Sequence, residues 1–229
     1  SSLTPRPSGG CKILRRKNAT SASGLPAMNK KERGELIVEC AKRLFVRKGF
    51  HGVTVSDIID EARIARSTFY AHFPGRMEIF QLLVDRYAAI LLDAIMGINI
   101  SRAGDDAPLS AQIREMSVGL VDAIDRNRDL TLLLITAPLG HDDQFDRSVS
   151  DFFSKILSAI RQLLVEGMEG RTIRKLDPDI ISYVILGSVK QILLQWLVYG
   201  EIDDIHAALD DITEYTLFGI AALSPAKTL

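Results

Sequence analysis

The sequence has few of the residues that hold small proteins together through disulfides or metals. Its only cysteines, Cys11 and Cys40, are far apart and fit neither a disulfide framework nor a metal-type spacing. Its histidines are scattered, without the paired spacing of metal ligands, at His51, His72, His141 and His206. We therefore expect a reduced, intracellular protein without a bound metal, in which Cys40 is a small buried apolar side chain.

The sequence also lacks an uninterrupted apolar run approaching the about 20 residues that a helix needs to cross a bilayer. The richest segment, residues 180–199, contains Lys190, Gln191 and Gln195. Residues 1–27 carry basic residues but no apolar core of a secretory signal. We expect a cytoplasmic protein with no membrane partner.

Features typical of enzymes are missing as well. No glycine-rich phosphate-binding loop occurs. His141 lies beside Asp142 and Asp143, and we interpret this group as a solvated loop rather than a metal site. The sequence therefore predicts neither a cofactor nor an enzyme, although an all-α enzyme with perturbed ionisable groups in a cleft is a further alternative.

The composition is that of a globular protein, and its charge is unevenly distributed. Of the 229 residues, 47% are hydrophobic and 25% are charged, with a net charge of −1. Residues 1–76 hold 15 Lys/Arg against 6 Asp/Glu, a net +9, whereas residues 77–229 carry a net −10. A basic segment joined to an acidic remainder indicates a polyanion partner for the first segment only.

Residues 1–27 are rich in Ser, Gly, Pro and basic residues and show no periodicity. We expect them to be a disordered extension, native or added by cloning, with Met28 as the natural start. The alternative is a basic arm that reaches a DNA groove, formed by Lys12, Arg15, Arg16 and Lys17.

The stretch from Thr54 to Glu78 predicts two short helices joined by a tight turn. Thr54 with Asp57 forms a capping box, so a helix begins at Val55. The apolar register breaks at residues 63 and 64, and a second short helix follows over about 65–72. A helix over residues 30–48, capped by Asn29, precedes them. This arrangement is typical of a helix-turn-helix.

The exposed start of the second helix is the part that meets base edges in the major groove. Arg66 has the fork that binds guanine, and Ser67 and Thr68 can bond to bases or phosphate. Hydroxyl, imidazole and guanidinium donors around the helix ends suit phosphates instead. We assign phosphate contacts to Thr54, Tyr70, His72 and Arg76. A solvated polar face is the alternative interpretation of this group.

The remainder of the chain predicts only helices. A long helix over 77–98 precedes a loop at 99–108, and further helices follow over 109–125, 130–137, 144–167, 178–200, with Asp177 as its cap, and 205–220. No strand-like alternation of useful length appears. The fold class is therefore all-α, with about nine helices.

Residues 180–199 are apolar nearly all the way round, so this helix must be covered on two sides. One side can face its own domain, and the other, with the last helix, a second copy in a four-helix arrangement. The alternative is a central core helix. Our candidates for a homodimer interface are Leu193, Leu197, Ile205, Leu209, Ile212 and Ile220.

The segment TVSDIIDEARIARSTFYAHFPGRMEIF closely resembles the helix-turn-helix signature of the TetR family of transcriptional regulators. The matching positions are Thr54, Ile58, Ala62, Thr68, Phe69, Tyr70, His72, Phe73, Arg76 and Glu78. Two positions depart from the pattern. Arg63 stands where the turn usually has Gly, and Ala65 stands where Ser or Thr often caps the second helix.

The resemblance implies a DNA-binding domain over 28–76 and an antiparallel helical domain for effector binding and dimerisation over 77–229. Polar or aromatic side chains on apolar helices are the candidates for the effector site, although packing in the core or the dimer interface is their alternative role. They are Met116, Phe153, Tyr183, Gln191 and Trp196.

The function that this resemblance implies is that of a repressor. It occupies a near-palindromic, double-stranded operator as a homodimer and leaves it when a small, hydrophobic effector binds. The alternative is a DNA-binding scaffold or interaction protein of the same fold that has no effector.

Overall fold

The computed structural model describes residues 29–98, 108–140 and 142–220. The expectations for residues 1–27, most of the predicted loop at 99–108, and His141 lie outside this part of the chain. Over the described residues the structure contains nine α-helices, one π-helical turn and no strand. The all-α fold class is therefore confirmed.

The first three helices form a unit that we call the head. They are α1 (Lys30–Lys48), α2 (Val55–Ala62) and α3 (Arg66–Tyr70). Both predicted capping boxes are present, Asn29 with Glu32 at α1 and Thr54 with Asp57 at α2. Helix α3 is shorter than the predicted 65–72, because Ala65 offers no side-chain cap and Pro74 follows closely.

Helix α4 (Arg76–Met96) leaves the head and runs into the rest of the molecule, which we call the body. The body consists of α5 (Leu109–Arg126), α6 (Arg128–Ile135), α7 (Asp143–Glu169), α8 (Pro178–Leu194) and α9 (Ile205–Ile220). The predicted helix over 178–200 is capped by Asp177 as expected, but its last turn, Gln195–Tyr199, is π-helical and ends at Gly200 in the left-handed conformation.

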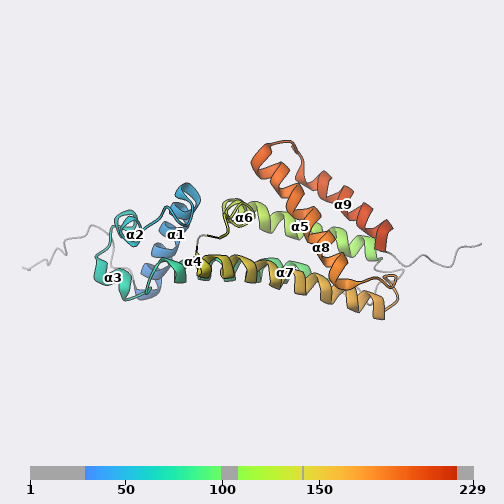
Figure 1. Ribbon diagram of the computed structural model, residues 1–229, viewed down its shortest axis with the longest axis horizontal. Coiled ribbons are helices and arrows are strands. Elements are labelled where there is room, and N and C mark those ends of the chain that lie inside the picture. The colour runs from blue at the N-terminus through green and yellow to red at the C-terminus, as the bar shows by residue number, and fades with distance from the viewer. Residues whose placement is uncertain (1–28, 99–107, 141, 221–229) are drawn as a thin grey trace, which may run out of the picture.

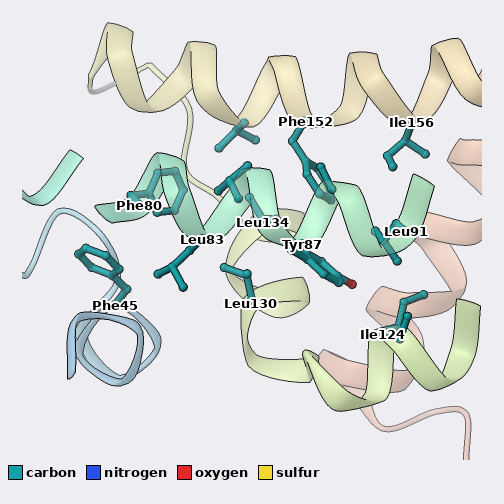
Figure 2. Close-up of a cluster of buried hydrophobic side chains, with 14 of the residues drawn as sticks. Phe45, Phe80, Leu83, Tyr87, Leu91, Ile124, Leu130, Leu134, Phe152 and Ile156 are labelled. Carbon is teal, nitrogen blue, oxygen red and sulfur yellow. The ribbon is translucent and has the colours of Figure 1, made fainter. Parts of the chain in front are cut away.

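Figure 1 shows an elongated molecule with the head at one end and the body at the other. Helices α4 and α7 extend along the body, α9 packs beside α5, and α8 packs against α7 and α9. The core is continuous along α4. In Figure 2, Phe80 and Leu83 lie near Phe45 of the head, whereas Tyr87 and Leu91 lie among side chains of the body.

The segment from Pro178 to Tyr199 passes a test of length and composition for a membrane-spanning helix, which by itself is weak evidence for a span. Only 11% of its apolar window is buried within the subunit. It nevertheless packs against α7 and α9 on one side. The structure therefore leaves one apolar side of α8 uncovered.

Candidate nucleic-acid interface and effector cavity

The turn between α2 and α3 is built around a left-handed residue. Arg63 has φ 54° and ψ 44°, and its backbone N–H donates to carbonyls at the end of α2. Ala65 occupies the N-cap of α3 in an extended conformation, and no side chain caps that end. The Phe69 side chain is completely buried. Because Phe69 anchors one side of α3, the opposite side faces solvent.

The base-contacting candidates lie on this exposed side or beside it. Arg66 and Ser67 are exposed, and Thr68 is half-buried. The Arg66 Nη2 atom donates to Ser56 Oγ at 3.1 Å, which holds the guanidinium over the start of α2. Ser56 is itself exposed, and sequence reasoning missed it. Its position near the start of α2 was the available signal, since helix N-termini attract phosphate.

Three of the four phosphate candidates remain available at the surface of the head. The Thr54 hydroxyl caps α2, donates to Asp57 Oδ2 at 2.5 Å and stays exposed. Tyr70 is 51% exposed. His72 is half-buried against α1, where its Nδ1 atom would lie 3.4 Å from a Cβ atom at position 34. Their contacts with DNA stay predictions.

Arg76 has a different environment. Its Nη1 atom donates to the carbonyl oxygens of Phe50 at 2.6 Å and Val53 at 2.5 Å, and its guanidinium lies 4.4 Å from the centre of the Phe50 ring. These contacts tie the start of α4 to the turn between α1 and α2. The Nη1 atom is thus engaged within the head, which gives Arg76 a structural role, and the phosphate contact predicted for Arg76 stays a prediction.

Several cations of the head are neutralised internally. Glu61 pairs with Arg47 at 3.1 Å and with Arg43 at 3.5 Å, and Asp57 pairs with Lys48 at 2.8 Å. Hydrogen bonds from Arg47 and Lys48 lower the pKa values of the Glu61 and Asp57 carboxyls. These basic residues at the end of α1 therefore hold α2 in place rather than being free to bind phosphate.

The body contains an apolar cavity with a volume of about 200 Å³. It is lined by residues of α4 to α9, including Tyr87 and Leu91 from α4, and Phe152 and Ile156 from α7. In Figure 2, Phe152 and Ile156 point from α7 toward α4, and Tyr87 and Leu91 lie on the side of α4 that faces Leu130 and Ile124.

Four hydroxyl groups of the lining form two hydrogen-bonded pairs. Tyr87 Oη and Thr131 Oγ1 are hydrogen-bonded at 2.5 Å, and Ser117 Oγ and Thr213 Oγ1 at 3.0 Å. Burial raises the pKa of Tyr87 to about 12, so this hydroxyl is protonated at neutral pH. The cavity wall thus offers an apolar surface with satisfied hydroxyls.

The five candidates for the effector site divide into two groups. Met116 and Phe153 line the cavity, although ligand binding by them stays a prediction. Tyr183, Gln191 and Trp196 do not line it. Tyr183 is 58% exposed and Gln191 is also exposed, both on the outer side of α8. Trp196 lies in the π-helical turn, where its ring contacts the Arg128 guanidinium at 4.3 Å.

Most of the candidates for the dimer interface lie inside the subunit rather than on its surface. Leu193, Ile205 and Leu209 are buried within the subunit, and Leu193, Leu209 and Ile212 line the cavity. Leu197 is half-buried, and the side chain of Ile220 lies outside the described part. The large apolar residues that α8, the π-helical turn and α9 expose are Ile180, Tyr183, Val184, Val198, Tyr199, Tyr215 and Phe218. Because α8 is apolar all round, periodicity did not tell its inner side from its outer side.

The start of α7 meets the head at an aromatic junction. The Phe145 ring stacks on Phe50 at 4.8 Å and lies 4.9 Å from His51. Asp142 caps α7 by accepting hydrogen bonds from the N–H groups of residues 144 and 145, and these bonds help to lower the pKa of its carboxyl. Helix α7, which lines the cavity, therefore also contacts the turn between α1 and α2, to which Arg76 is hydrogen-bonded.

Comparison with known proteins agrees with this geometry. Residues 37–83 match the family model for bacterial regulatory proteins of the tetR family. The HTH-type transcriptional regulator YuxN of Bacillus subtilis is 23% identical over 170 residues, which cover 73% of this chain but only 56% of that relative. The nucleoid occlusion factor SlmA of a Shewanella species is 23% identical over 175 residues, 75% of this chain and 85% of SlmA.

Solved structures share the whole fold. A TetR-family transcriptional regulator from Syntrophomonas wolfei covers 88% of this chain and 100% of its own, with a TM-score of 0.69 and 19% identity. FadR from Bacillus subtilis, solved with stearoyl-CoA, covers 80% and 96% with a TM-score of 0.65 and 16% identity. The match over residues 37–83 shows a helix-turn-helix DNA-binding segment of the tetR type in this chain, and together with the shared fold it supports a TetR-family transcriptional regulator.

Proposed function

We propose that this regulator is a repressor that binds a near-palindromic operator as a homodimer and releases it when a small hydrophobic effector occupies the body. The observation that carries the proposal is the apolar cavity of about 200 Å³, because two of its walls, α4 and α7, continue to the head. A chain whose relatives are transcriptional regulators needs no catalytic group for this role, and it acts in the cytoplasm, where the DNA is.

The proposal assigns residues 28–76 to a DNA-binding domain and residues 77–229 to effector binding and dimerisation. The charge distribution supports this division, since positions 29–76 have 10 Lys/Arg and 6 Asp/Glu whereas residues 77–229 are acidic. We assign base contacts to Arg66, Ser67 and Thr68, with Ser56 as a further contact. Phosphates are bound around Thr54, Tyr70 and His72.

The second copy covers the exposed apolar side of α8 and α9. Tyr215 and Phe218 are each 78% exposed, and Tyr183 and Val184 are 58% and 53% exposed. Apolar side chains this large and this close together are typical of an interface. A two-fold axis through this pair of helices forms a four-helix arrangement and places both heads on one DNA duplex.

The effector acts through its preference for one of two arrangements of the head. Half-sites on one DNA face lie about 34–36 Å apart, so a small rotation of each head prevents simultaneous binding. An effector that spreads α4 and α7 moves Phe145 and Arg76, and with them the turn before α2. Only a difference in affinity between the two arrangements drives this change.

A structural neighbour supports the hydrophobic class of the effector. FadR from Bacillus subtilis was solved with stearoyl-CoA, a molecule with a long apolar chain. The cavity described here is smaller than the about 300 to 1,000 Å³ of sites for drug-sized ligands. We therefore propose a shorter apolar molecule as the effector.

A second candidate function is a DNA-bound interaction protein without an effector. The similarity to the nucleoid occlusion factor SlmA favours it, and so does the exposed apolar side of α8 and α9. A cavity that stays empty in the native protein, together with a monomer that binds another protein through α8 and α9, would support this second function.

Selection of duplexes from a random pool tests the DNA-binding part of the proposal. We expect enrichment of an inverted repeat whose half-site centres lie about 10 base pairs apart. Arg66→Ala should relax the preference at one position in each half-site, whereas a matched change at Arg33, exposed on α1, should leave the selected sequence unchanged. A pool without enrichment would refute operator recognition.

A further inference from the structure

Among the described residues that line the cavity, Lys190 alone carries a charge. The lining holds no Asp, Glu or Arg among these residues, and its remaining side chains are apolar or carry a hydroxyl. Lys190 lies on the inner side of α8 with Leu186, Val189 and Leu193, which also line the cavity. A lone cation in the apolar segment 180–199 was visible in the sequence, but sequence reasoning gave it no role.

The ammonium group of Lys190 is held at the cavity wall. Its Nζ atom lies 4.0 Å from the centre of the Phe153 ring, a cation–π geometry. Phe153 is also a lining residue. No carboxylate pairs with Lys190 in the described part of the chain, although Lys48 and Lys155 each have an aspartate partner. Lys190 is therefore a lining residue whose charge has no carboxylate partner among the described residues.

A cation without a carboxylate partner beside apolar surface can pair with an anion that approaches it. An anionic group on a ligand supplies that partner, and a carboxylate does so with a charge-assisted hydrogen bond. The hydroxyl pairs of the lining are already satisfied, so they do not recruit a second polar group. One positive charge next to an otherwise apolar space matches a molecule with one acidic end.

We propose that the effector is an amphipathic monocarboxylic acid whose carboxylate pairs with Lys190 and whose apolar chain fills the cavity. This inference rests on the proposed function, because it names the ligand class of the same cavity. An engineered apolar cavity of about 150 Å³ binds benzene, so the cavity of about 200 Å³ suits a ligand of roughly ten non-hydrogen atoms. Octanoate has that size.

Calorimetry with octanoate, 1-octanol and octylamine on the full chain tests the inference. The wild type should bind octanoate roughly tenfold or more tightly than 1-octanol, and octylamine most weakly. Lys190→Met keeps most of the apolar stem but removes the charge. It should weaken octanoate binding roughly tenfold or more and leave 1-octanol binding unchanged, which also shows that the variant is folded. Lys190→Arg should retain the preference for the acid.

Lys175→Met is the matched control, because Lys175 is exposed and lies outside the lining. It should leave all three affinities unchanged. Equal binding of octanoate and 1-octanol, or an unaltered octanoate affinity in Lys190→Met, would overturn the pairing of a carboxylate with Lys190. Either result would leave the proposed hydrophobic effector in place. Absence of binding by both octanoate and 1-octanol would overturn the carboxylate pairing with Lys190 and the proposed function together. Tighter binding of octylamine would overturn the assigned charge.

Discussion

Arg63 shows how a single residue of the head tolerates an unfavourable conformation. A side chain in the left-handed region costs roughly 1 to 2 kcal/mol relative to the right-handed helical region, whereas glycine adopts it freely. The sequence identified this position as a departure from the family pattern, and the structure gives Arg63 a φ of 54°. The chain therefore keeps the turn at some cost in stability.

Arg63→Gly should accordingly stabilise the protein by about 1 kcal/mol, because glycine removes the Cβ clash. Thermal unfolding should show a melting temperature higher by roughly 2 to 4 °C. The same replacement at Arg33, which is exposed within α1, should instead destabilise by about 1 kcal/mol. Equal destabilisation at both positions would mean that the left-handed conformation of Arg63 is wrong.

Arg76 and Arg66 should respond differently to the same substitution. Arg76→Met removes the hydrogen bonds to the carbonyls of Phe50 and Val53, so we expect a loss of about 2 kcal/mol in the free energy of unfolding. Arg66→Met should change stability by less than about 0.5 kcal/mol but weaken DNA binding. Urea unfolding and fluorescence anisotropy measure the two effects. A stable Arg76→Met variant with weaker DNA binding would instead favour a phosphate contact by Arg76.

At the scale of the elements, α8 marks the limit of prediction from this sequence. Capping residues and 3.6-residue periodicity located the helices well, and Asp177 and Pro178 began α8 where expected. The inner side of α8 was not predictable, because apolar residues surround it and only packing against α7 and α9 selects a side. Tyr183 was therefore assigned to the cavity although its side chain is exposed, and Leu193 was assigned to the dimer interface although it is buried and lines the cavity.

The junction between α7 and the head was also beyond prediction. Phe50 and Phe145 are 95 positions apart in sequence, and no local pattern relates them. We expect this pair to couple the cavity to the DNA-binding surface. The head itself was more predictable, because its capping boxes and its turn depend on residues that are neighbours in the chain.

Phe145→Leu tests the coupling element. Leucine keeps an apolar contact but loses the ring stacking with Phe50, so the variant should bind DNA and effector separately with near wild-type affinity. The factor by which effector weakens DNA binding should fall, since that factor measures the coupling free energy. Anisotropy titrations with and without effector give the factor. If effector weakens DNA binding by the same factor in the variant as in the wild type, Phe145 does not couple the cavity to the DNA-binding surface.

For the whole molecule, the exposed side of α8 and α9 predicts the oligomeric state. Phe218→Glu or Tyr215→Glu places a charge in the proposed interface, and light scattering should then report a monomer. Ile90→Glu is the control, because Ile90 is a 45% exposed apolar residue on α4, away from these two helices. It should remain a dimer. A wild-type monomer at micromolar concentration would contradict the four-helix interface.

The central claim is that occupation of the cavity releases DNA. The most direct measurement is the anisotropy of a selected operator duplex bound to the dimer during titration with octanoate. We predict release in the wild type and none in Val189→Phe, whose larger side chain fills the cavity without touching the head. If octanoate binds the wild type, as calorimetry would show, and the duplex stays bound at saturation, the account is contradicted.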